Sequence, residues 1–124
     1  MWWLSAAAGL CSLGGAACKD RPATPAEIAD RGWAAHLEVV AAGERAPSCA
    51  EAGPAMQRAF AAHRQAFVDA LALDHDRQKL VEATAYLEDH PDRYPDLEAR
   101  MTALSERCAD DAAVQAVFTA MASP

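Results

Sequence analysis

The residues best suited to chemistry are two histidines, His36 and His63, each near the middle of an apolar helical pattern. Two neutral imidazoles on facing helices can ligate haem iron or a transition metal. With antiparallel helices, they would lie about 10 and 14 Å from the shared connection and face each other across a core. However, the chain has no Cys-x-x-Cys-His motif, and neither histidine has an acidic residue three or four positions away. A histidine in an apolar stripe is more often a hydrogen-bonded core residue, so we expect no cofactor.

Other residues with reactive side chains have simpler structural explanations. Residues 74–76 (Asp-His-Asp) and 90–92 (His-Pro-Asp) resemble metal-binding clusters in composition only. Both fall where helices are predicted to begin or end, and acidic residues at N-caps explain them. The methionines occupy core positions of predicted helices: Met56, Met101 and Met121. Because no nucleophile elbow or glycine-rich phosphate loop is present, we expect no catalytic residues and a non-enzymatic protein.

The N-terminal segment is typical of a targeting signal. Residues 2–17 carry no charge and are apolar or small, which is marginal for a membrane span and typical of a signal peptide. Gly15-Ala16-Ala17-Cys18 resembles the lipobox of bacterial lipoproteins, with Gly15 where that family usually has Leu. The resemblance implies cleavage before Cys18 and lipidation of Cys18, which anchors the protein to a membrane of the cell envelope. The alternatives are ordinary cleavage after Ala17, giving a secreted or periplasmic protein, or an uncleaved anchor.

The number of cysteines agrees with export and lipidation of the chain. Cys11 leaves with the signal peptide, so the mature chain keeps Cys18, Cys49 and Cys108. Lipidation of Cys18 leaves Cys49 and Cys108 to form a disulfide in an oxidising compartment. In a simple up-and-down bundle these two residues lie at opposite ends. The disulfide therefore requires that residues 43–53 run along the bundle or that the helices pack at steep angles; otherwise the pairing is wrong.

The elements that position these residues are predicted to be α-helices throughout. Alanine and helix-forming charged residues dominate, and no alternating β pattern occurs. We expect a signal peptide at 1–17, a tether at 18–24 and one all-α domain, a bundle of four to five helices, at 25–122. Capping residues, prolines and glycines place the helices at about 25–42, 54–73, 76–90, 95–108 and from 110 or 111 onward. The first helix is expected to have Thr24 as its N-cap and to stop at Gly43, and the connection at 43–53 has room for a short turn capped by Ser48 and Glu51. Whether the second and third helices are continuous stays open.

The apolar stripes predict which residues face the core. The clearest stripe consists of Met56, Phe60, His63, Phe67 and Leu71. In the helix at 76–90, the inward residues are expected to be Leu80, Val81, Thr84 and Leu87. Tyr86 falls on the other side of that helix, so it is the one named candidate for an exposed apolar contact with a partner.

The charge pattern excludes one class of partner. The net charge is −7, and acidic and basic residues are mixed, so no basic stripe could neutralise a row of phosphates. Nucleic-acid binding is therefore disfavoured. The sequence favours a non-enzymatic, lipid-anchored helical protein of the cell envelope that acts through contacts with an unidentified protein. The alternative is a haem- or metal-binding bundle that uses His36 and His63.

Overall fold

The computed structural model describes residues 21–93 and 96–124, and within these ranges the chain is helical without a β-strand. Five α-helices and two 3₁₀-helices follow in the order α2 (Pro25–Arg45), α3 (Cys49–Ala72), η2 (Leu73–His75), α4 (Arg77–Asp89), η3 (Pro91–Arg93), α5 (Leu97–Arg107) and α6 (Ala112–Ala122). This confirms the predicted all-α bundle. The predicted signal peptide at 1–17 and the predicted lipidation site, Cys18, lie outside the described residues.

Side-chain caps define where the helices begin. The Thr24 hydroxyl accepts a hydrogen bond from the Glu27 amide at 3.1 Å and so caps α2, as predicted. A carboxylate oxygen of Asp111 accepts one from the Val114 amide at 3.0 Å and caps α6. Each bond satisfies one of the amides that a helix N-terminus leaves without an intrahelical partner.

The predicted connection at 43–53 is wrong, because two helices extend into it. Ser48 caps α3 by accepting a hydrogen bond from the Glu51 amide at 3.3 Å, so α3 begins at Cys49 and contains Pro54. At the other side, α2 continues through Gly43 to Arg45. Gly43 is buried, and a Cβ atom there would lie 2.7 Å from both Leu104 Cδ2 and Met56 Sδ. This glycine permits close packing and does not stop the helix.

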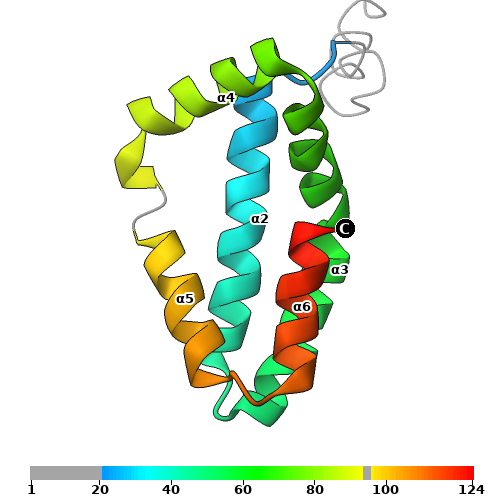
Figure 1. The fold of residues 1–124 in the computed structure, drawn as a ribbon, viewed down its shortest axis with the longest axis vertical. Helices are drawn as coiled ribbons and strands as arrows, with labels where there is room; N and C mark the ends of the chain where they lie inside the picture. Colours follow the sequence, from blue (N-terminus) through cyan, green and yellow to red (C-terminus); the bar gives the residue numbers. More distant parts are fainter. Residues whose placement is uncertain (1–20, 94–95) are drawn as a thin grey trace, which may run out of the picture.

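The helices form a two-helix centre with three helices around it (Figure 1). α2 and α3 run antiparallel and pack along their length, and α6 lies against α3. η2 separates α3 from α4, so these two helices are not continuous. α4 then crosses the end of the bundle at which α2 begins and α3 ends, and α5 returns beside α2.

The crossing of α4 explains how the disulfide forms. Because α4 lies across the bundle, α5 runs in the same direction as α2 and ends beside the start of α3 (Figure 1). Cys49 and Cys108 therefore meet at the end opposite α4, with their Cα atoms 5.6 Å apart, and they form the predicted disulfide. The steep helix crossing resolves the conflict that an up-and-down bundle would have created.

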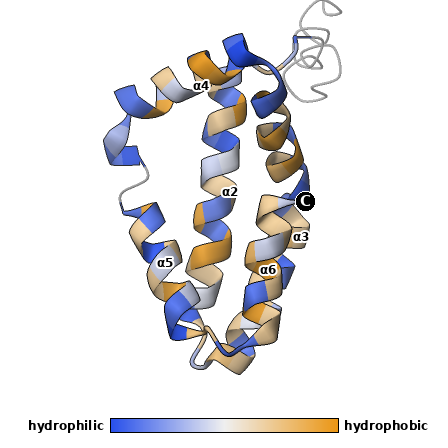
Figure 2. Cartoon of the chain, viewed as in Figure 1, coloured by the Kyte–Doolittle hydropathy of each residue, from blue (hydrophilic) through white to orange (hydrophobic). Residues whose placement is uncertain are grey.

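The core divides into a large and a small cluster. The large cluster joins α2, α3, α5 and α6, and its fully buried members include Val39, Val40, Met56, Phe67, Leu97, Val114 and Val117. The small cluster lies beneath α4 and consists of Ala29, Leu73 and Ala83, with Ile28, Tyr86 and Leu87 packed at its edge. Figure 2 shows hydrophobic and hydrophilic residues interleaved along α4.

The predicted orientation of α4 is only partly right: Leu87 packs at the edge of the small cluster, as expected, but the other three residues predicted to face inward are exposed. The buried residue of α4 is Ala83, at 3% exposure, whereas Leu80 and Val81 are 38% and 61% exposed and Thr84 is exposed. A helix that crosses an end packs through a short contact, and a small residue there lets it come close to α2. The predicted α3 stripe is interrupted at His63 and ends at Phe67, since His63 and Leu71 are exposed while Met56, Phe60 and Phe67 are buried.

Candidate functional site

Three half-buried side chains with polar or aromatic groups lie toward the end of the bundle that α4 crosses, although others, such as Arg100, Asp111 and Phe118, lie elsewhere. We call the crossed end the α4 end; it comprises the first turns of α2, the last turns of α3, η2 and α4. Trp33 and His36 lie on its α2 side, and Tyr86 lies on its α4 side, all three half-buried. The opposite end carries the disulfide. The α4 end is therefore a part of the described chain where recognition chemistry can be built.

A cavity of about 170 Å³ lies between α2, the end of α3 and α4. Small residues create it: Ala29, Gly32, Ala70 and Ala83 line the walls, where larger side chains would fill the space. Its polar lining comes from three residues, His36, Asp74 and Thr84. Trp33, Leu73, Leu80 and Leu87 complete the apolar surface. The cavity is thus an apolar hollow with a few polar groups at defined positions.

His36 is neutral and oriented by its own helix. Its Nδ1 lies 2.7 Å from the carbonyl oxygen of Gly32. Because a carbonyl only accepts, Nδ1 carries the hydrogen and Nε2 is left as a hydrogen-bond acceptor. Burial lowers the pKa of His36 below its ordinary value of 6.5, and the hydrogen bond to Gly32 opposes that shift only in part. The ring packs against Phe67, with the ring centroids 4.5 Å apart.

The structure does not bring His36 and His63 together across the core. Phe67, one turn along α3 from His63, occupies the position opposite His36, and His63 is exposed. The periodicity of α3 placed both residues on one stripe, but only Phe67 lies on the buried part of it. Within residues 21–93 and 96–124, no group of three or more His, Cys, Asp or Glu side chains is arranged to hold a metal ion. His75 and His90 are exposed as well.

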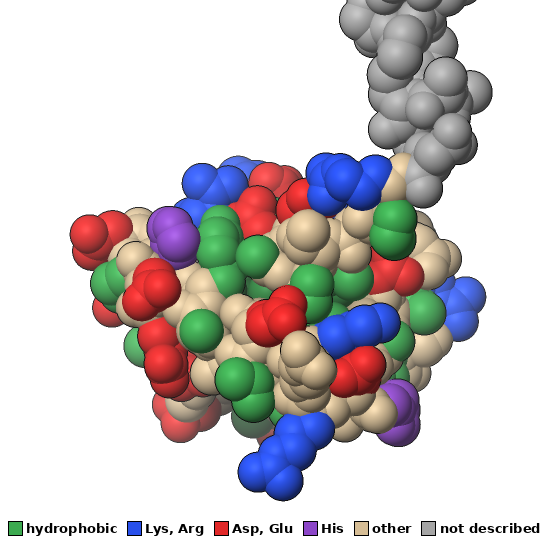
Figure 3. All heavy atoms as spheres, turned by 90° about the horizontal axis from the view of Figure 1, so that it is seen from above, with side chains coloured by type: hydrophobic (Ala, Val, Ile, Leu, Met, Phe, Trp, Pro, Cys, Tyr) green, Lys and Arg blue, Asp and Glu red, His purple; other side chains and the backbone are tan. Residues whose placement is uncertain are grey.

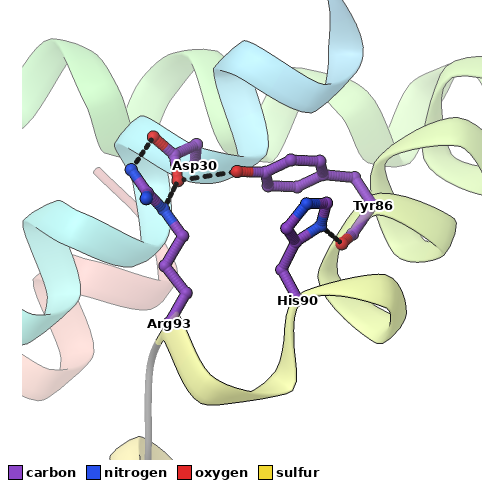
Figure 4. A network of polar contacts seen from close by, with 4 residues as sticks. All are labelled: Asp30, Tyr86, His90 and Arg93. Carbon is purple, nitrogen blue, oxygen red and sulfur yellow. Dashed lines mark hydrogen bonds and ion pairs between the residues drawn. The ribbon is translucent and has the colours of Figure 1, made fainter.

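A network of polar contacts ties α4 and η3 to α2 (Figure 4). Asp30 accepts a hydrogen bond from the Tyr86 hydroxyl at 3.1 Å and two from the Arg93 guanidinium, one of them from Nη2 at 3.1 Å. The His90 ring lies against that of Tyr86, and its Nδ1 donates to the Tyr86 carbonyl at 2.7 Å. Partial burial and the bond to Asp30 raise the pKa of Tyr86 above its ordinary value of 10.0.

This network removes Tyr86 as the predicted contact residue. Its ring packs at the edge of the small cluster and its hydroxyl is engaged by Asp30, so Tyr86 holds the fold together at the α4 end. Sequence reasoning missed the network because Asp30 lies 56 and 63 positions from its two partners. No local pattern marks an aspartate on a polar helix face as the acceptor for so distant a tyrosine and arginine.

Exposed apolar side chains also gather at the α4 end. In the described part of the chain, all the exposed large aliphatic residues fall within residues 68–81: Val68, Leu71, Leu80 and Val81. Seen end-on in Figure 3, hydrophobic side chains lie between acidic and basic ones on this face. Near Val68, Arg64 of α3 donates a hydrogen bond to the Pro124 carbonyl at 2.8 Å, which holds the segment after α6 against α3.

Leu80 and Val81 border a shallow apolar hollow on the outer side of α4. We call it the α4 hollow; its lining is Leu80, Val81, Thr84, Ala85 and Glu88. Nearly all of the surface in this hollow is apolar, although it faces solvent. Neighbouring exposed apolar side chains can form part of a surface where another molecule binds.

No protein-family model, curated protein or solved structure matches this chain. The described helices also include none that is long and apolar enough to cross a membrane. The interpretation of the site therefore rests on its own geometry.

Proposed function

We propose that this chain is a lipid-anchored, non-enzymatic helical module of the cell envelope that acts through protein contacts made by the α4 hollow. The disulfide supports the proposed location in the cell envelope. Cys49 and Cys108 pair with each other, so Cys18 is the odd cysteine of the mature chain. Disulfides persist in oxidising compartments, and lipidation at Cys18 uses the remaining thiol.

The proposed contact rests on one observation, the location of the exposed large apolar residues. They lie at the end where α2 begins, and Cys18 precedes the α2 cap, Thr24, by six residues. An extended tether of that length reaches about 20 Å. A lipid on Cys18 keeps the α4 end close to the bilayer, so the α4 hollow is presented to a partner at the membrane.

Charge specifies the partner further. Glu88 is the one charged residue that lines the α4 hollow, and the chain carries a net charge of −7. The same helix also exposes Glu82 and, in its first turn, Arg77 and Lys79. An aliphatic surface with a carboxylate in its lining complements a protein surface that has an apolar anchor beside Lys or Arg. An anionic lipid surface would be repelled by the net negative charge of the chain. We therefore assign the α4 hollow to a membrane-associated protein and not to the bilayer itself.

Site-specific photo-crosslinking in the native cell tests this proposal. A photoreactive residue replaces Val81 in the α4 hollow, and the matched control replaces Ala50, an exposed residue at the disulfide end. We expect a discrete protein adduct from position 81 and none from position 50, with the adduct weakened by Glu88→Lys. Adducts to lipid alone from position 81, or identical adducts from both positions, would refute the proposed protein contact.

A further inference from the structure

We propose that the cavity beneath α4 binds a small organic ammonium: one apolar ring or short alkyl chain that carries a single positive charge. This goes beyond the contact surface described above. The cavity shares Leu80 and Thr84 with the α4 hollow, but its other lining residues come from α2, the end of α3, η2 and the inner side of α4, and Val81 does not line it. The inference rests on the size of the cavity, the kind of polar atoms that line it and the position of its one charged group.

The volume sets the size of the ligand. An apolar cavity of about 150 Å³ accommodates a molecule such as benzene. The cavity beneath α4, at about 170 Å³, therefore holds a single ring, with little room for a second. Ala29, Ala70 and Ala83 leave this space open between two helices and the crossing α4, and the aromatic ring of Trp33 forms part of the wall. An apolar ligand body replaces contacts that the chain itself does not make there.

The polar lining sets the charge of the ligand. Asp74 supplies a carboxylate, and His36 has Nδ1 engaged by Gly32, which leaves only Nε2, an acceptor. Thr84 adds a hydroxyl, and no Lys or Arg lines the cavity. The Trp33 indole N–H and the Thr84 hydroxyl can donate hydrogen bonds, but Asp74 is the one charged group of the lining, and its negative charge favours an ammonium and disfavours a carboxylate.

The burial of the lining residues gives the orientation of the ligand in the cavity. Asp74 and Thr84 are exposed, whereas Ala29, Ala83 and Leu73 are buried. The ligand ring therefore enters among the alanines, and its ammonium stays near Asp74, where it keeps part of its hydration. Leaving the charge at the mouth avoids the high cost of burying an ion without full pairing.

Three probes of one shape test the inference by NMR titration of the disulfide-bonded mature protein. 2-Phenylethylammonium carries the charge, 2-phenylethanol is neutral, and phenylacetate is anionic. We expect the ammonium to bind with a dissociation constant on the order of 1 mM, to shift the Trp33 indole and Ala83 amide signals, and to bind about tenfold tighter than the alcohol. Phenylacetate should be weaker still.

Variants separate a built site from general attraction to an acidic protein. Asp74→Asn should abolish the preference for ammonium over alcohol, whereas Asp110→Asn, the same charge change at an exposed residue near the disulfide, should preserve it. Thr84→Trp places a large side chain at the exposed rim and should weaken binding of both probes. Equal binding of all three probes, or equal effects of Asp74→Asn and Asp110→Asn, would overturn the proposal.

Discussion

The sharpest quantitative prediction concerns the disulfide between Cys49 and Cys108. Replacing both residues with alanine removes the crosslink and avoids burying a polar hydroxyl at position 108, which is only 2% exposed. The bond joins the start of α3 to the end of α5 and therefore restrains the whole chain between them, including α4. In the folded protein other contacts already hold these elements. The effect of the crosslink thus falls mainly on the unfolded chain.

The length of the closed loop gives the magnitude. The two cysteines are 59 positions apart. Loop closure of that length lowers the entropy of the unfolded chain enough to contribute about 4 kcal/mol to stability at 25 °C. A domain of this size typically has 5–15 kcal/mol in total, so the double variant should lose a large part of its stability. Its unfolded state should also be more expanded, which raises the dependence of the unfolding free energy on urea.

Urea unfolding followed by circular dichroism measures this loss. The double-alanine variant and the wild-type protein with its disulfide reduced should agree within about 1 kcal/mol, because both lack the same restraint. Oxidised wild type should lie about 4 kcal/mol above both. A difference below about 1 kcal/mol between the oxidised protein and the double variant would refute the reasoning that the crosslink acts through the unfolded chain.

Two further predictions use the same assay. Burial holds the pKa of His36 below 6.5, so the stability that neutral His36 contributes is present above pH 6.5 and is lost as the pH falls from there toward the folded-state pKa. His36→Gln should flatten this part of the plot of stability against pH. The control variant His63→Gln, at an exposed position, should leave it unchanged. Gly53→Ala should destabilise by about 1–3 kcal/mol, because its Cβ would lie 2.7 Å from the Cβ of Ala113 and 3.4 Å from backbone atoms of α6. Gly43→Ala, whose Cβ would meet side-chain atoms of Leu104 and Met56 and no backbone atom, should cost less, and equal costs would contradict the packing argument.

The sequence predicted where the helices begin better than how they are oriented in space. Helix starts at Thr24 and Asp111 follow from local hydrogen-bond chemistry, so the residues themselves reveal them. Gly43 was misinterpreted as a stop, because a glycine at a helix end and a glycine at a close helix contact look the same along the chain. Only the positions of Leu104 and Met56 in space distinguish the two.

The candidate site was predicted least well, and α4 shows why. Periodicity assigns the larger residues Leu80 and Val81 to the core, but the crossing of α4 places Ala83 against α2 and turns Val81 outward. The cavity depends on that crossing, as does the bond between Asp30 and Tyr86. A direction set by tertiary packing is not encoded in a local pattern, so neither feature was available from the sequence.

The most direct test of the proposed function is the intact mass of the protein extracted from its own membranes. We expect the mass of a chain that begins at Cys18, carries a diacylglyceryl modification there, and lacks the two hydrogens that are lost when Cys49 and Cys108 form the disulfide. Reduction should restore those two hydrogens and leave the lipid in place. A chain with an unmodified Cys18, or one that keeps residues 1–17, would contradict the lipid anchor on which the proposed contact at the α4 end depends.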